Sequence, residues 1–311
     1  MPNAESHVLL QDALADAMSI QAALDVQMVS VRRAAESLQQ EIQDAQEVAM
    51  LALAEMARCR DSDTQEHLLR TRSYAQILAA RLALSSPYSG QIDRQFLRNL
   101  YRASPLHDIG KLVVNDAILL KPGPLTPEQY EEMKQHTIVG GEILEEAARR
   151  HRGGRALAMA AVVARCHHER FDGSGYPVGL KGQAIPLAAR IVSLADVYDA
   201  LTSSRCYKPA YSAVYSRSII ERGSGTQFDP EIVAAFRASL DEFDQVLQQN
   251  EARSQIGDET ASVAAASSSV DPRQKAWAHT DHSSLGGWSP SGTRARVIHA
   301  GWDEVLGSRS P

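Results

Sequence analysis

Residues 8–57 contain neither glycine nor proline and are rich in alanine, glutamine, glutamate and leucine, which predicts one long helix. Its apolar side chains recur every seven residues in two rows. The first row is Leu10, Ala17, Leu24, Val31, Leu38, Ala45 and Ala52, and the second is Leu14, Gln21, Met28, Ala35, Ile42, Ala49 and Met56. A heptad repeat of this length favours a coiled coil over a simple amphipathic helix.

The partner of this helix decides what residues 1–57 do. We expect a parallel homodimer, and the alternative is a helix that folds back on its own domain. Gln21 is the one polar residue in the two rows, and such a residue can fix the register of a coil. The many alanines predict a weak coil that can shift between states, which suits the transmission of a signal.

The remaining chain divides into a helical part and a polar part. Residues 58–245 show helical periodicity without sustained strand alternation, which predicts an all-α domain. Within it, Thr126 as the N-cap, Pro127 at the first helical position and Gln129 at the third indicate a helix start. Residues 246–311 are dominated by small and polar residues, which predicts a disordered tail.

The overall charge and the cysteines exclude several classes of protein. A formal net charge of -6 argues against binding of nucleic acid polymers, because no net basic field meets the phosphates. No apolar run reaches the roughly 18 residues of a membrane span, and the N-terminus lacks a signal-peptide pattern. Three scattered cysteines give neither a disulfide framework nor a thiolate zinc site. We expect a soluble, cytoplasmic protein.

Histidine and aspartate cluster at separate places in the helical part. Adjacent pairs occur at His107-Asp108 and His167-His168, and Asp63 and His67 are four residues apart, so they share a face of a helix. His136 and Asp196 add one donor each. Nitrogen and carboxylate donors without clustered cysteines suit hard or borderline metals such as Fe or Mn. The sequence therefore predicts a metal-dependent enzyme.

Two of these clusters belong to longer motifs. The segment His107-Asp108-Ile109-Gly110-Lys111 and the segment from His167 to Pro177 resemble the two signature motifs of the HD-GYP phosphodiesterases. The likeness covers about 48–240 and continues through Ile185-Pro186, Ala195 to Ser203, Arg205 to Lys208 and Gly225 to Pro230. It implies an all-α helical bundle of the HD phosphohydrolase superfamily that hydrolyses cyclic di-GMP to pGpG or GMP in bacterial second-messenger signalling.

The resemblance also implies a set of metal ligands. These are His67, His107, Asp108, His136, His167, His168 and Asp196. Asp108 would bridge two divalent ions. Asp63 matches an acidic position that holds a third ion in some members, where glutamate is usual, and Gln65 stands where the family typically has glycine. These two departures leave a two-metal site intact.

Hydrolysis of a phosphodiester suits this set of residues. Two metal ions lower the pKa of a bridging water, so that a metal-bridging hydroxide attacks, and they clamp the attacking and leaving oxygens. Lys111 follows His107 by four residues, so its ammonium can reach the same pocket and stabilise developing charge. We therefore predict catalytic roles for Asp108 and Lys111.

Substrate contacts are expected outside the metal ligands. Arg205 and Lys208 are three residues apart and suit a phosphate that no metal holds, although an ordinary solvated basic pair gives the same pattern. Tyr176 offers a ring for packing or for stacking near a base. Glu169 and Asp172 could orient the histidine ligands, or could be salt-bridge partners at a helix end.

Two other functions remain open from the residues alone. A domain of this kind could bind cyclic di-GMP or a GGDEF-domain cyclase without turnover. It could also hydrolyse a different nucleotide by the same metal chemistry. Loss of a metal ligand or of Lys111 would favour the first alternative, and neither is lost.

Overall fold

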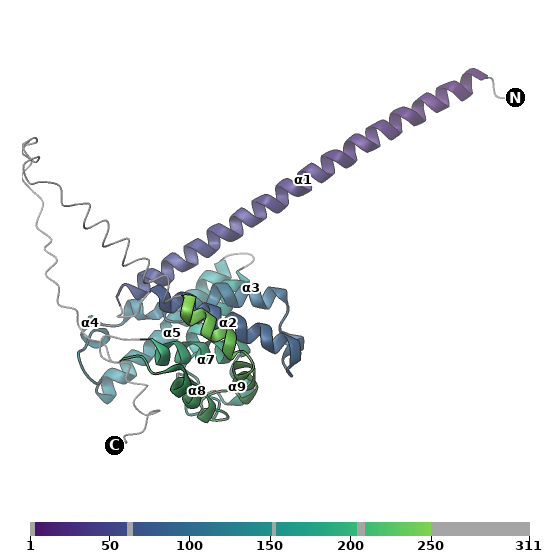
Figure 1. Ribbon diagram of the computed structural model, residues 1–311. Helices are drawn as coiled ribbons and strands as arrows, with labels where there is room; N and C mark the ends of the chain where they lie inside the picture. Colours follow the sequence, from purple (N-terminus) through teal and green to yellow (C-terminus); the bar gives the residue numbers. More distant parts are fainter. Residues whose placement is uncertain (1–3, 61–64, 151–153, 204–208, 250–311) are drawn as a thin grey trace, which may run out of the picture. The chain divides into compact units, whose positions relative to one another are not determined.

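The computed structural model describes residues 4–60, 65–150, 154–203 and 209–249 (Figure 1). Every regular element in these ranges is a helix, apart from one isolated β-bridge between Ser224 and Phe228. The predicted all-α class is confirmed. The elements are α1 (Ala4–Arg58), α2 (Gln65–Ser85), η1 (Ser89–Gln91), α3 (Arg94–Ala103), η2 (Ser104–Leu106), η3 (Ile109–Val113), α4 (Asp116–Leu119), α5 (Pro127–Arg150), α6 (Arg155–Cys166), η4 (Gly182–Ala184), α7 (Leu187–Thr202), α8 (Ala213–Arg222) and α9 (Pro230–Arg237). Residues 240–249 are helical as well.

The long N-terminal helix is present as predicted. Helix α1 runs without interruption for 55 residues. The chain divides into two compact units between Ala49 and Met50, so α1 contributes to both. In the first unit, apolar side chains of both heptad rows are exposed, including Leu24 at 50% and Met28 at 71%. The described helices include none that is both long enough and apolar enough to cross a membrane.

The core of the second unit surrounds α7. Fifteen consecutive residues of α7, from Leu187 to Leu201, are buried, so every face of this helix is covered. Aromatic rings fill the space between α7, α2 and the helix at 240–249: the Tyr74 and Phe243 rings stack with centroids 4.5 Å apart, and Tyr198 meets Tyr74 edge-on at 5.3 Å. A helix buried this completely is a rigid support for Asp196, which it carries.

The last turns of α1 belong to a second apolar cluster. Met50, Ala54 and Ala57 are buried against Leu68 of α2 and against residues of η2, η3 and α6. Arg60, just past the end of α1, donates to the carbonyl oxygens of Leu112 and Val114, the latter at 3.0 Å, and pairs with the Asp116 carboxylate. The end of α1 is therefore fixed to the turn formed by η3.

Helix α5 begins as its sequence predicts. The Gln129 backbone N–H donates to Thr126 Oγ1 at 3.3 Å, and the Thr126 backbone N–H donates to Gln129 Oε1 at 3.0 Å. This reciprocal pair is a capping box, which satisfies two backbone donors at the helix start. The helix then packs against α6 and η3.

Two glycines allow the η3 turn to touch α5 directly. A Cβ atom on Gly110 would lie 1.9 Å from the His136 carbonyl oxygen and 2.7 Å from the Gly140 nitrogen. Gly140 is reciprocally close, because its own Cβ would meet the Gly110 nitrogen at 3.0 Å. Only backbone fits between these two elements, and the contact places Asp108 beside His136.

Candidate metal centre

The seven predicted ligands come from five separate segments. His67 lies on α2, His107 and Asp108 lie between η2 and η3, His136 is on α5, His167 and His168 directly follow α6, and Asp196 is on α7. The structure brings all seven together. They form two groups, and the potential ligand atoms within each group lie within 4.8 Å of one another. One group is Asp108, His136, His167 and His168, and the other is His67, His107 and Asp196.

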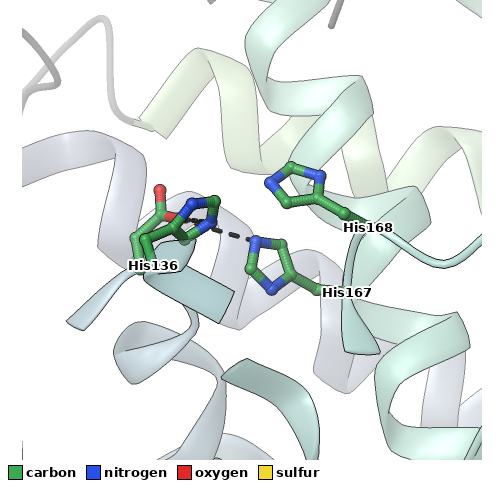
Figure 2. A group of neighbouring side chains, drawn as sticks. His136, His167 and His168 are labelled. Atoms are coloured by element: carbon green, nitrogen blue, oxygen red, sulfur yellow. Dashed lines mark ion pairs between the residues drawn. The ribbon is translucent and has the colours of Figure 1, made fainter. Parts of the chain in front are cut away.

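Asp108 faces both groups. Its Oδ1 is 3.4 Å from His136 Nε2 and 3.5 Å from His167 Nε2. Its Oδ2 is 3.4 Å from His107 Nε2, in the other group. Figure 2 shows the rings of His136, His167 and His168 gathered at one point. The carboxylate therefore stands where a bridge between two ions would stand.

The second group is held by α2 and α7. His67 Nε2 is 3.6 Å from Asp196 Oδ1, and His107 Nε2 is 3.8 Å from the same oxygen. The rings of His67 and His107 meet edge-on with centroids 5.6 Å apart. Both groups therefore combine imidazole nitrogen with carboxylate oxygen.

Backbone carbonyls fix the orientation of three of these imidazoles. The Nδ1 atom lies 2.9 Å from Ser104 O in His107, 2.7 Å from Met133 O in His136, and 3.1 Å from Val163 O in His167. A carbonyl can only accept, so each Nδ1 carries the proton and each Nε2 presents its lone pair to the centre.

Those lone pairs have no hydrogen-bond partner within the described ranges. Nε2 of His107, His136 and His167 and Oδ1 of Asp108 are buried without a hydrogen bond of good geometry. Burial of so many unsatisfied polar atoms in one place is costly unless another group binds them. The donor set therefore fits divalent metal ions, and nitrogen and carboxylate ligands at this spacing are the ones such ions take.

Burial and neighbouring charges shift the pKa values of His136, His107 and Asp108 in different directions. Burial lowers the pKa of His136 to about 3, so this ring is neutral and ready to bind a cation. Burial opposes the charged form of His107 too, but the negative charges of Asp108 and Asp196 outweigh it and raise the His107 pKa to about 9, so its Nε2 offers a lone pair only to a cation that displaces the proton. Although burial raises the pKa of Asp108, the charges of Lys111 and His107 hold it well below the usual value.

Asp199 was not predicted as a site residue, and the structure places it directly behind His67. Its Oδ2 is 2.8 Å from His67 Nδ1, and Arg70 Nε donates to its Oδ1 at 2.5 Å. The carboxylate is fully buried. A carboxylate on the Nδ1 side turns the Nε2 lone pair towards the centre, as in carboxylate–histidine–metal arrangements. The sequence signal is its spacing of three from Asp196, which puts both on neighbouring faces of α7.

Lys111 lies in the centre, as its spacing predicts. Its side chain is 2% exposed, and Nζ is 2.8 Å from Asp108 Oδ2. The η3 turn carries it there, because Asp108 and Lys111 are three residues apart and the Lys111 N–H donates to the Asp108 carbonyl at 2.9 Å. A buried ammonium next to the Asp108 carboxylate is a local source of positive charge.

Glu169 has a different role from either one predicted. Its buried carboxylate accepts from the backbone N–H groups of Val178, Gly179 and Leu180, at 2.9 to 3.1 Å. It contacts the loop backbone rather than a histidine ring or a basic side chain. Asp172 accepts from Ser174, with which it forms a local turn, and its Oδ1 lies 3.8 Å from Arg170 Nε, so it is a salt-bridge partner, one of its two predicted roles. Glu169 therefore holds the loop that follows the two histidines.

That loop places Tyr176 against a predicted ligand. The Tyr176 ring stacks on His168 with centroids 4.8 Å apart and an interplanar angle of 28°. It also meets the Tyr130 ring edge-on at 6.0 Å. Burial, together with nearby negative charge, raises the pKa of Tyr176 well above its usual value, so the phenol stays protonated.

Three other predicted residues, Asp63, Arg205 and Lys208, lie outside the described residues.

Comparison with known proteins identifies the family. The HD domain family model matches residues 51–232, which is more than half of the chain. The chain belongs to the HD domain family, and the predicted HD-GYP resemblance is confirmed by its relatives. A "Cyclic di-GMP phosphodiesterase" of Vibrio cholerae serotype O1 is 44% identical over 208 residues, which are 67% of this chain and 42% of the relative.

Two other relatives differ in the substrate that their names give. A "Cyclic di-GMP phosphodiesterase" of Thermotoga maritima is 41% identical over 181 residues, covering 58% of this chain and 46% of the relative. A "3'3'-cGAMP-specific phosphodiesterase 2" of Vibrio cholerae is 36% identical over 191 residues, covering 61% and 34%. The chain spans about half the length, or less, of these relatives.

Proposed function

We propose that residues 58–245 form a phosphodiesterase domain that hydrolyses cyclic di-GMP to pGpG, to GMP or to both. The observation that carries the proposal is the pair of adjoining donor groups, with Asp108 of one group facing His107 of the other and with buried Nε2 atoms that have no hydrogen bond. The names of the relatives support the cyclic dinucleotide as substrate.

In this proposal the two groups hold two divalent metal ions, with iron or manganese as the best match to the donors. The ligands are His67, His107, Asp108, His136, His167, His168 and Asp196. Such ions activate a water molecule at neutral pH and withdraw charge from the phosphate. The protein fixes the ligands in advance, since three of the imidazoles are oriented by backbone carbonyls and His67 by Asp199.

In this proposal Lys111 and Asp108 control the charge around the phosphate that is cleaved. Asp108 spans both groups, and its carboxylate balances the ammonium of Lys111 at 2.8 Å. When negative charge grows on the phosphate oxygens, that buried ammonium stabilises it where little water competes. Arg205 and Lys208 remain candidates for the phosphate that is not being cleaved, and Tyr176 remains a candidate for substrate contact.

The first test is hydrolysis itself. Protein purified anaerobically and loaded with Fe(II) or Mn(II) is expected to convert cyclic di-GMP to linear products, followed by liquid chromatography. Lys111→Met keeps the volume of the buried chain and removes its charge, so kcat should fall about 10²–10³-fold while both metals stay bound. The matched control is Lys121→Met, because Lys121 contacts Gln129 outside the centre. Tight binding of cyclic di-GMP to fully loaded protein without turnover would instead indicate a receptor.

A second test concerns the support behind His67. Asp199→Asn is expected to weaken metal binding about 10–100-fold, because the ring loses the carboxylate that orients it. Equilibrium dialysis against a metal buffer measures this affinity on protein whose folding is checked by circular dichroism. Asp244→Asn is the control, since it removes an ion pair, with Arg217, at a less buried position and touches none of the seven residues. Equal metal affinity in the two variants would contradict the assigned role.

The partner of α1 in this proposal is a second copy of the chain. Apolar side chains at matching heptad positions, such as Leu24 and Leu38, are 50% and 57% exposed in the single chain. Pairing of such rows in a coiled coil removes that surface from water, which is favourable in proportion to the apolar area buried. A GGDEF-domain partner remains a further candidate.

A further inference from the structure

A cavity of about 260 Å³ lies between the start of α5 and the loop at 175–179. On the helix side it is lined by Glu131, Lys134, Gln135 and Ile138. These four positions follow the spacing of one helical face, so their side chains point the same way. The adjoining face of the same helix carries His136, which lies in the metal centre.

Tyr176 connects this cavity to the metal centre. The ring lines the cavity and stacks on His168 at 4.8 Å. The Lys134 ammonium lies 5.4 Å from the centre of that ring and 4.7 Å from the centre of the Tyr130 ring. A base joined through one ribose to a phosphate at the metals would therefore meet this cavity at the edge of the centre.

The polar groups of the cavity match the edge of a guanine. Glu131 Oε1 and Lys134 Nζ are 2.6 Å apart, which sets an acceptor and a donor side by side. Guanine presents the complementary order on one edge, with N1–H and N2–H₂ as donors next to O6 as an acceptor. Adenine reverses that order, because it has an acceptor at N1 and a donor at N6. A carboxylate facing an adenine N1 would leave two acceptors opposed.

We propose that Glu131 and Lys134, together with the Tyr176 loop, form a subsite that recognises one guanine of the substrate. Glu131 accepts from N1–H and N2–H₂, and Lys134 donates to O6. This inference rests on the proposed function, since it names the group that selects cyclic di-GMP among cyclic dinucleotides.

Glu131→Gln tests the subsite with little change in shape. The amide keeps one acceptor but presents a donor to the guanine donors, so kcat/KM for cyclic di-GMP should fall about 10-fold or more. The ratio of kcat/KM values for cyclic di-AMP and cyclic di-GMP should rise, because glutamine pairs well with adenine. Hydrolysis of bis(4-nitrophenyl) phosphate, which has no purine, should stay unchanged.

The matched control is Glu132→Gln. Glu132 is exposed on the same turn and does not line the cavity, so the same chemical change should leave all three substrates unaffected. Equal effects of the two variants on cyclic di-GMP would overturn the guanine subsite and leave the proposed function intact. Wild-type protein that cleaves only bis(4-nitrophenyl) phosphate would overturn the proposed function, and with it the subsite.

Discussion

Asp108→Asn is expected to abolish activity and to empty both halves of the metal centre. The carboxylate faces three imidazoles, with Oδ1 towards His136 and His167 and Oδ2 towards His107. An amide in its place offers one neutral oxygen and no charge to offset two cations. We expect metal content to fall from about two ions per chain to less than one. Activity should fall about 10³-fold, which corresponds to about 4 kcal/mol of transition-state stabilisation.

Metal content is measured by inductively coupled plasma mass spectrometry, and turnover by chromatography of the products. Asp172→Asn is the matched control, because the partners of that carboxylate, Ser174 and Arg170, lie in the same nearby loop. An Asp108→Asn protein that keeps two ions would show that Asp108 does not bridge them. Activity loss with full metal content would leave Asp108 a role in catalysis alone.

Gly110→Ala is expected to destabilise the domain by about 3 kcal/mol and to lower its metal content. The added methyl would lie 1.9 Å from the His136 carbonyl oxygen, and backbone on both sides prevents a small local adjustment. The η3 turn must then separate from α5, which draws Asp108 away from His136. In a domain of this size the change corresponds to a decrease of about 6–12 °C in Tm.

Thermal unfolding and metal analysis of the same preparation measure both effects. Gly90→Ala is the control, since a Cβ there has nothing within 4 Å and the residue lies in a short surface helix. Wild-type stability in Gly110→Ala would mean that the turn and α5 can move apart freely, contrary to the close approach seen here.

The sequence predicted the metal centre better than its surroundings. All seven ligand candidates that the motifs indicate converge in space, because each motif fixes both residue type and local backbone. Asp199 was not predicted as a site residue, because its spacing from Asp196 puts both on α7 but does not reveal that α7 packs against α2 and brings Asp199 to His67. Neither role offered for Glu169 is the one that the structure shows, for a related reason: its carboxylate accepts from backbone N–H groups, and no side-chain pattern in the sequence reveals such contacts.

Among the helices too, features set by residues close in sequence were predicted, and features set by distant residues were not. The unbroken α1 and the capping box at Thr126 and Gln129 follow from residues close in sequence, and both are confirmed. The complete burial of α7 depends on helices from distant parts of the chain, and Tyr176 stacks on His168 only because Glu169 holds the loop. The predicted domain limits and the coiled-coil dimer stay predictions.

The hydrogen bonds of Arg60 give the end of α1 a mechanical consequence. The guanidinium donates to the carbonyl oxygens of Leu112, which directly follows Lys111, and of Val114, which caps the end of η3. A displacement or rotation of the last turn of α1 therefore pulls on the same short segment that positions the lysine ammonium. Strain applied along the helix therefore reaches the Asp108 carboxylate through Leu112 and the ion pair with Lys111, so a small movement of the helix end changes the geometry of the site.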